Sequence, residues 1–533
     1  MHRELDTRNL LLFGGLVAAI AAGWLLGRSP WDDVAPRATS RTVASEPFVA
    51  REWGNTTSST PRKVGFRADE DALQNGALPG QRTMRFASAE DLARFLARAG
   101  DRVRVMDRID SLNALRISFL DPDDLTDLLD GSEEMGFIFP AYTPNPTGGM
   151  VQEDAVPLGN QLLEWLGLNA ADLTLGTGVK IAILDTGVVP HPAYGDVKNV
   201  FIVPGMENYL DWNGHGTAVA SLILGNSATV PGAAPGASLT SWRVADDSGA
   251  SDSWKIAQAI IQAADAGNQI ISISMGSYGD SIMLRDAVLY AQNKNIVVIA
   301  SSGNDGYTQS AYPAGYPNVI AAVGLDAQNN HLLFSNQASD SALAAPGWGV
   351  TAAYPGDRVT SFSGTSASAP ILAGTVAAVM SAKNLSAQQA VAAIYQHTNE
   401  AGAAGHDSLT GAGAIHLGRI LRSDNSNIMD AAAASNFITP PVPGAVAQVQ
   451  VNIQNQGTAT LSNVPVTVTT PSGMTQLTVS SLAPGAVKSY TIGLSNSLFG
   501  NGKSVNVTTQ IGGQDAVSSN NFRSTTYTPP PAP

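Results

Sequence analysis

The chain has 533 residues, of which 44% are hydrophobic and only 14% are charged. This length accommodates three or four domains with sizeable cores, and the apolar content excludes a disordered acidic protein. The net charge of −14 argues against nucleic-acid binding, and the absence of cysteine excludes disulfides, iron–sulfur clusters and a thiol nucleophile.

The charged residues are concentrated in the first part of the chain. Residues 1–150 contain 17 Lys and Arg and 21 Asp and Glu, whereas the much longer segment 151–533 contains 13 and 23. We therefore expect the first 150 residues to form a separable part, followed by domains of low charge.

Near the N-terminus, Leu10–Gly27 is an uninterrupted run without charge. The run is at the lower limit for crossing a bilayer and somewhat long for a signal-peptide core. Residues 1–28 therefore predict a signal peptide or a membrane anchor, and either one exports the rest of the chain. A buried core helix is the alternative. Residues 29–80, rich in Ser, Thr, Pro and Gly, predict a linker.

Residues 81–146 predict a small α/β domain. Ser88 precedes an apolar helical stripe and has Asp91 three residues later, which is a helix-capping arrangement. The remaining predicted elements are strands at 83–86, 102–106 and 114–119, a helix at 121–129 and an extended stretch at 136–141.

Residues 150–424 predict an α/β domain built on a parallel sheet. Nearly continuous apolar strands alternate with helices, which is typical of a sheet covered on both faces. The expected strands are 179–184, 270–274, 295–300 and 319–323, and the expected helices are 216–224, 254–266, 282–293 and 368–381. In such a sheet, functional residues lie at the carboxyl ends of the strands.

Residues 438–527 predict an all-β sandwich, followed by a flexible tail at 528–533. Short alternating stretches are separated by Asn-Gln-Gly, Pro-Ser-Gly and Asn-Gly turns. Pro440, Pro441 and Pro443 mark a domain boundary, so we expect that truncation near Asn425–Pro440 leaves the preceding domain intact.

Three short motifs bring together a carboxylate, an imidazole and a hydroxyl. Asp185 ends an apolar strand in Ile-Leu-Asp-Thr-Gly, His215 opens a helix in Asn-Gly-His-Gly-Thr, and Ser366 starts a helix in Ser-Gly-Thr-Ser-Ala. Each residue alone is compatible with a structural role such as helix capping. Together they supply a nucleophile, the base that it needs and the carboxylate that orients the base.

The order Asp, His, Ser and the three motifs resemble the subtilisin-like serine proteases, the subtilase or peptidase S8 family, over about residues 158–422. The resemblance implies that Asp185 orients the imidazole, His215 is the general base and Ser366 is the acyl-forming nucleophile. The segment Ala300–Asn304 resembles the family's oxyanion-hole segment, in which Asn304 donates its side-chain amide beside the backbone N–H of Ser366.

The resemblance also implies a substrate cleft. One edge is Ser274, Met275 and Gly276, and Ser248–Ala250 lies opposite. The specificity pocket is walled by Ser274–Gly276 and by Ser301, Ser302 and Gly303, with Ala311 at its floor. None of these residues is charged, so we expect a preference for apolar side chains of medium to large size. Asp252 and Asp280 lie nearby, either as surface acids or as groups that favour basic residues further out.

No metal ligand set is expected. The acidic residue that the family carries after the Asp motif is replaced by Ala193 or Tyr194, which makes the family's calcium site doubtful. We expect no cofactor, and no calcium site can be assigned.

Two flanking segments resemble known modules. Residues 81–146 resemble the family's inhibitory propeptide in position and pattern, and the C-terminal domain resembles bacterial cell-adhesion-related, Ig-like β-sandwich repeats. The resemblance implies an exported endopeptidase, extracellular or in the cell envelope, with protein or peptide substrates and its own propeptide as inhibitor. The rivals are an acid-active serine-carboxyl peptidase, against which His215 argues, and a catalytically silent adhesion protein.

Overall fold

The structure is a computed structural model that describes residues 66–143, 152, 154–203, 213–499, 503–513 and 515–528. The predicted signal or anchor segment and most of the predicted linker lie outside these residues.

The N-terminal domain, residues 66–143, contains a four-stranded antiparallel sheet in the order β2-β3-β1-β4. Its elements are α2 (Phe66–Gln74), β1 (Gln81–Phe86), α3 (Ala89–Ala99), β2 (Val103–Ile109), β3 (Ala114–Phe119), α4 (Pro122–Thr126), β4 (Glu133–Gly136) and β5 (Pro140–Tyr142). The expected linker therefore ends earlier than residue 80, because α2 lies within it. The predicted cap is confirmed, since the Ser88 hydroxyl accepts a hydrogen bond from the Asp91 N–H.

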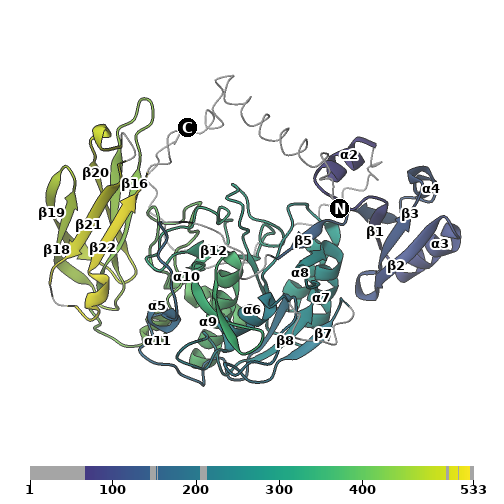
Figure 1. The fold of residues 1–533 in the computed structure, drawn as a ribbon, viewed down its shortest axis with the longest axis horizontal. Coiled ribbons are helices and arrows are strands. Elements are labelled where there is room, and N and C mark those ends of the chain that lie inside the picture. Colours follow the sequence, from purple (N-terminus) through teal and green to yellow (C-terminus); the bar gives the residue numbers. More distant parts are fainter. Residues whose placement is uncertain are drawn as a thin grey trace, which may run out of the picture. The chain divides into compact units, whose positions relative to one another are not determined.

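The central domain, residues 154–424 with the gap at 204–212, is called the catalytic-type domain after its sequence resemblance. It is organised around a seven-stranded sheet in the order β13-β12-β11-β10-β6-β8-β7, with every neighbouring pair parallel. Figure 1 labels β7, β8 and β12 of this sheet. Its strands are β6 (Lys180–Asp185), β7 (Lys198–Phe201), β8 (Ser238–Arg243), β10 (Ile270–Ile273), β11 (Val297–Ser301), β12 (Ile320–Leu325) and β13 (Ala342–Pro346). Strands β10, β11 and β12 are buried throughout, and β6 is buried after Lys180, because helices cover both faces.

The helices of this domain are α5 (Leu162–Trp165), α6 (His215–Leu224), α7 (Ser253–Asp265), α8 (Ile282–Asn293), α9 (Thr365–Lys383), α10 (Ala387–Gln396) and α11 (Leu417–Arg422). The prediction for α8 is confirmed residue for residue. Three shorter strands, β9 (Ala250–Asp252), β14 (Val350–Tyr354) and β15 (Arg358–Phe362), lie outside the large sheet.

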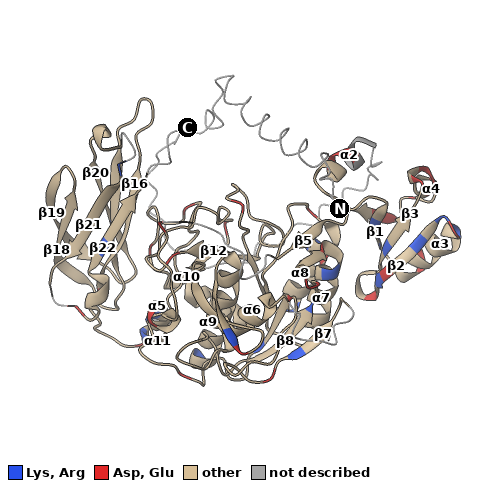
Figure 2. Cartoon of the chain, viewed as in Figure 1, with Lys and Arg blue, Asp and Glu red and all other residues tan. Residues whose placement is uncertain are grey.

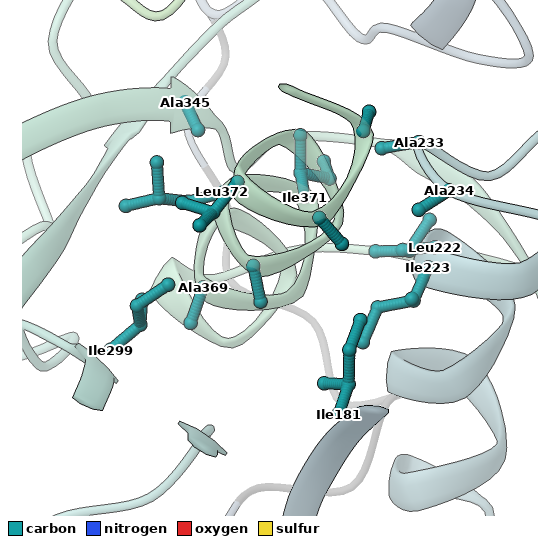
Figure 3. Packing of buried hydrophobic residues seen from close by; sticks show 14 of the residues in the cluster. Ile181, Leu222, Ile223, Ala233, Ala234, Ile299, Ala345, Ala369, Ile371 and Leu372 are labelled. Atoms are coloured by element: carbon teal, nitrogen blue, oxygen red, sulfur yellow. The ribbon is translucent and has the colours of Figure 1, made fainter. Parts of the chain in front are cut away.

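Helix α9 crosses the middle of the hydrophobic core. Figure 3 shows its residues Ala369, Ile371 and Leu372 among side chains from β6, α6, β11 and β13. Among the described residues, α9 is the one helix long and apolar enough to cross a membrane, but 89% of its most apolar window is buried inside the protein. Its apolar character is therefore explained by the core of this domain.

The C-terminal β domain consists of a three-stranded sheet, β16-β17-β20, and a four-stranded sheet, β19-β18-β21-β22, which share one hydrophobic core. Its strands are β16 (Ala431–Thr439), β17 (Gln448–Asn455), β18 (Leu461–Thr470), β19 (Gly473–Leu482), β20 (Val487–Gly493), β21 (Val505–Ile511) and β22 (Phe522–Tyr527). The expected boundary at residue 438 is wrong, since β16 already pairs with β17 from Ala431. Figure 2 shows few charged residues on these sheets and many on the N-terminal domain.

Candidate active site

Asp185 and His215 form the most buried polar pair of the site. Asp185 is the last residue of the central strand β6, and His215 is the first residue of α6; both side chains have no exposed surface. His215 Nδ1 lies 2.8 Å from Asp185 Oδ1 and 2.9 Å from Oδ2. The Thr186 N–H donates to the same carboxylate at 2.7 Å. This arrangement leaves Nε2 as the nitrogen that faces away from the carboxylate.

Two glycines allow His215 to sit at the start of α6. Gly214 has φ of +86°, a left-handed conformation that side chains disfavour. At Gly216, an added Cβ would lie 2.3 Å from the carbonyl oxygen of Gly187. The motif around His215 therefore reflects backbone geometry as well as chemistry.

Ser366 lies in the first turn of α9, where helical N–H groups have no intrahelical acceptor. Pro370, four residues later, has no N–H, so the Ser366 carbonyl lacks its usual helical donor. The Ser274 hydroxyl donates to this carbonyl at 3.1 Å, and the Ser366 hydroxyl donates to the Ser274 carbonyl at 3.2 Å. Ser274 thus fixes the nucleophile candidate from the neighbouring strand end.

The link between serine and histidine is not formed in this structure. Ser366 Oγ bonds to Ser274, and the buried Nε2 of His215 has no hydrogen-bond partner among the described residues. A rotation about χ1 redirects a serine hydroxyl, and catalytic hydrogen bonds are often loose before substrate binds.

Asn304 is oriented by the residue that precedes Ser366. Its Oδ1 accepts from the Thr365 N–H at 2.9 Å and from the Thr365 hydroxyl at 3.0 Å. Both bonds hold the oxygen, so the Nδ2 donor is directed elsewhere, and Asn304 lines the same cavity as Ser366.

A cavity of about 700 Å³ adjoins Ser366. Six of the seven predicted pocket residues line it: Ser274, Met275, Gly276, Ser301, Gly303 and Ala311. Ser302 does not, because its side chain is fully buried beside Ser335. The predicted pocket residues carry no charge, but Asp305 also lines the cavity and accepts a hydrogen bond from the Tyr278 hydroxyl. Asp305 follows Asn304 directly, and that adjacency was the available sequence signal.

The cleft is occupied by the chain's own segment Pro140–Thr143. Strand β5 pairs antiparallel with β9, and Tyr142 forms an antiparallel bridge with Gly276 on the other side. The Thr143 N–H donates to the Gly249 carbonyl at 3.0 Å. Thr143 and Ser366 line the same cavity, so an extended chain lies between both predicted edges of the cleft.

Ionic and hydrogen-bond contacts hold the N-terminal domain on the catalytic-type domain. Arg116 pairs with Asp252 at 3.0 Å, and both side chains are largely buried. Asp107 accepts from the Trp254 indole at 3.0 Å, and Arg85 lies 3.0 Å from Asp286. With the N-terminal domain in place, Asp252 is thus neither a free surface acid nor a group available to a substrate. Asp280 is 42% exposed and pairs with Arg285.

The residues at the doubtful calcium position do not fit a hard cation. Ala193 and Tyr194 are buried in the apolar core, and the Tyr194 hydroxyl donates to the Val189 carbonyl at 2.8 Å. Burial raises the pKa of Tyr194, which keeps it neutral and a poor ligand for calcium. Within the described part of the chain there is no group of three or more His, Cys, Asp or Glu side chains that could hold a metal.

Comparison with known proteins agrees with this architecture. Residues 176–413 match the model of the subtilase family. The chain is 39% identical over 206 residues to subtilisin Savinase from Lederbergia lenta, covering 38% of this chain and 77% of that protein. It is 39% identical over 231 residues to thermitase from Thermoactinomyces vulgaris, covering 42% and 82%.

Two further similarities are partial or more distant. M-protease from Shouchella clausii is 38% identical over 250 residues, covering 45% of this chain; the chain spans 65% of that relative's length. The solved structure of the epidermin leader peptide processing serine protease from Staphylococcus aureus has a TM-score of 0.54 at 21% identity, covering 66% of this chain and 99% of that one, and supports the fold alone. On its matched sequence and parallel-sheet domain, the chain belongs to the subtilase family.

Proposed function

We propose that this chain is a serine endopeptidase in which Asp185, His215 and Ser366 act together. The observation that carries the proposal is the buried Asp185–His215 pair at 2.8 Å, with Ser366 and Asn304 lining one cavity. In the proposed reaction, Ser366 Oγ attacks the scissile carbonyl while His215 Nε2 takes its proton. Asp185 holds the imidazole through Nδ1 and stabilises the imidazolium.

The charge that develops on the substrate carbonyl oxygen is stabilised by two donors, the Ser366 N–H and Asn304 Nδ2. The tetrahedral intermediate then collapses as the imidazolium gives its proton to the leaving amine. Water, deprotonated by the neutral imidazole, hydrolyses the acyl-enzyme and regenerates the Ser366 hydroxyl. We propose no metal and no cofactor in this reaction.

Substrates bind as an added strand between the two cleft edges, in the manner that Pro140–Thr143 adopts. Alternate side chains of such a strand point into the enzyme. We propose a preference for apolar residues of medium to large size at the pocket walled by Ser274–Gly276 and Ser301–Gly303. Asp305 adds one carboxylate to this lining, and a peptide-library cleavage profile measures how far it extends the preference to basic residues.

The N-terminal domain is proposed as an inhibitory propeptide that the enzyme removes itself. Thr143, which follows β5, lines the same cavity as Ser366, and the covalent tether gives this segment an effective concentration on the order of mM. We propose self-cleavage between about Tyr142 and Asp154, after which the domain stays bound until it is degraded. Export by Leu10–Gly27, as signal peptide or anchor, belongs to the same proposal, and so does the Ig-like, adhesion-type character of the C-terminal β domain.

The experiment compares the wild type with Ser366→Ala and with Ser361→Ala, a matched control at an exposed serine five residues away. Removal of one triad member costs about 10⁴–10⁶ in rate, so Ser366→Ala loses peptide hydrolysis and Ser361→Ala keeps it. N-terminal sequencing then gives a start between residues 143 and 154 for wild type and Ser361→Ala only. If all three proteins start upstream of Gly136, self-processing is wrong and the N-terminal domain is permanent.

A further inference from the structure

A buried arginine lies on the strand next to Asp185 and is linked by hydrogen bonds to the Asp185–His215 pair. Arg243 is the last residue of β8 and is the register partner of Asp185 across the parallel β6–β8 pair. Its side chain is 1% exposed. A buried guanidinium destabilises the fold unless its N–H groups form hydrogen bonds, so the partners of Arg243 show what the buried charge holds in place.

One branch of hydrogen bonds runs from Arg243 to the carboxylate of Asp185. Arg243 Nη1 donates to the Thr186 carbonyl. This fixes the residue whose own N–H donates to Asp185 Oδ1 at 2.7 Å. The Thr186 hydroxyl also accepts from the Gly216 N–H at 3.0 Å, next to His215. Displacement of Thr186 would therefore disturb both members of the pair.

A second branch runs from the same guanidinium to the backbone of His215. Arg243 Nη2 pairs with Asp247 Oδ1 at 3.0 Å, and the Asp247 carbonyl accepts from Asn213 Nδ2 at 3.2 Å. The Asn213 Oδ1 in turn accepts from the His215 N–H at 3.1 Å. The two branches start on one planar group and end on the two residues whose separation must stay fixed.

We propose that Arg243 is a positioning residue for the proposed reaction: its guanidinium holds Thr186 and Asp247, and through them sets the geometry of Asp185 and His215. The planar fork suits this role because its donors diverge at fixed angles. An ammonium at the same place keeps the charge but has no fixed fork. The proposal rests on the proposed function, because its effect is on that reaction.

The test compares Arg243→Met, Arg243→Lys and the control Arg419→Met in peptide hydrolysis, with rates normalised to the folded fraction measured by circular dichroism. Arg419 is a matched control because it is 5% exposed and donates to carbonyls of residues 397 and 398, away from the pair. Misplacement of a catalytic group by about 1 Å costs on the order of 10²-fold. For Arg243→Met we therefore expect kcat to fall by about 10–100-fold while KM changes less than about twofold.

Arg243→Lys keeps the charge without the fixed fork, so it is expected to recover only a small part of the lost kcat, and Arg419→Met is expected to keep kcat while melting earlier. The proposal is overturned if Arg243→Met keeps kcat within about twofold of wild type, or if KM rather than kcat changes. If Arg243→Met does not fold, Asp247→Asn decides. It weakens the second branch with little change of volume, and we expect a several-fold lower kcat at unchanged KM; an unchanged kcat overturns the proposal. A wild type without hydrolysis refutes the proposed function instead.

Discussion

The contact between the C-terminal β domain and the catalytic-type domain predicts a measurable loss of stability when Gln454 is shortened. Gln454 lies in β17 and is 4% exposed. Its Oε1 accepts from the Glu400 N–H and its Nε2 donates to the Thr398 carbonyl, both at 3.0 Å. Both partners belong to the catalytic-type domain, so this amide joins the two domains.

The magnitude follows from which groups lose their partners in Gln454→Ala. The Thr398 carbonyl keeps a bond from Arg419 at 2.7 Å, whereas the Glu400 N–H and Gln456 Nε2 both lose Gln454 Oε1 as acceptor in a buried place. An orphaned buried donor costs about 1–3 kcal/mol. With the lost packing of the side chain, we expect about 2–3 kcal/mol, which corresponds to a melting temperature lower by about 4–12 °C.

The assay is differential scanning calorimetry in the Ser366→Ala background, which prevents self-digestion during heating. Gln476→Ala is the matched control, because Gln476 is an exposed glutamine in β19 of the same domain. Its transition is expected to coincide with that of the parent. A Gln454→Ala transition within about 1 °C of the parent would show that the hydrogen bonds of Gln454 do not stabilise the contact between the two domains. The sequence alone predicts that removal of the C-terminal domain leaves the rest of the chain intact. The contacts of Gln454 predict instead that deletion of residues 431–533 destabilises the catalytic-type domain.

Four further predictions follow from individual contacts. Asn304→Ala should lower kcat by about 10²–10³ at similar KM, the size known for losing this donor in a subtilisin, measured by steady-state hydrolysis. Arg116→Met should weaken the bound N-terminal domain, so that activity appears sooner after self-cleavage; an unchanged lag would count against the Asp252 contact. Burial raises the pKa of Glu400 from 4.5 to about 7, so its ionised form destabilises the fold: this stability is full below about pH 4.5 and is lost as pH rises through 7. The free energy of unfolding of Glu400→Gln should therefore exceed that of its parent by about 3 kcal/mol at pH 8 and equal it at pH 4.5, as measured by thermal unfolding at both pH values. Because Ala193 and Tyr194 do not fit a cation, a chelator should leave the melting temperature unchanged, and a clear decrease would show a metal site.

The fold was predictable where local pattern and tertiary role agree. The apolar spacing of Ile282–Asn293 predicts α8 without error. Strand β16 was missed from Ala431 onward because a run of alanines has little β propensity; its conformation comes from pairing with Gln448–Asn455. Helix α2 was missed because four of the nine residues of Phe66–Gln74 are charged and the segment lies next to a stretch rich in Ser, Thr and Pro.

The site was predictable from sequence where short motifs name the residue, but its orientation depends on distant partners. The reciprocal bonds between Ser274 and Ser366 join residues 92 positions apart, and nothing local indicates them. The sequence predicts Ser302 in the pocket, yet this residue follows the end of β11 and its side chain is buried beside Ser335, which is distant in sequence. The position of Arg243 behind Asp185 likewise follows from the parallel register of β6 and β8.

The most direct measurement of the central claim is labelling with a fluorophosphonate, followed by mass spectrometry of the labelled peptide. A serine hydroxyl reacts with this reagent only when an adjacent base activates it. The proposed triad predicts a single phosphonylated residue, Ser366, with labelling abolished in Ser366→Ala and His215→Ala and retained in Ser361→Ala. Label on another serine, or equal labelling of wild type and His215→Ala, would contradict the assignment of Ser366 as the nucleophile activated by His215.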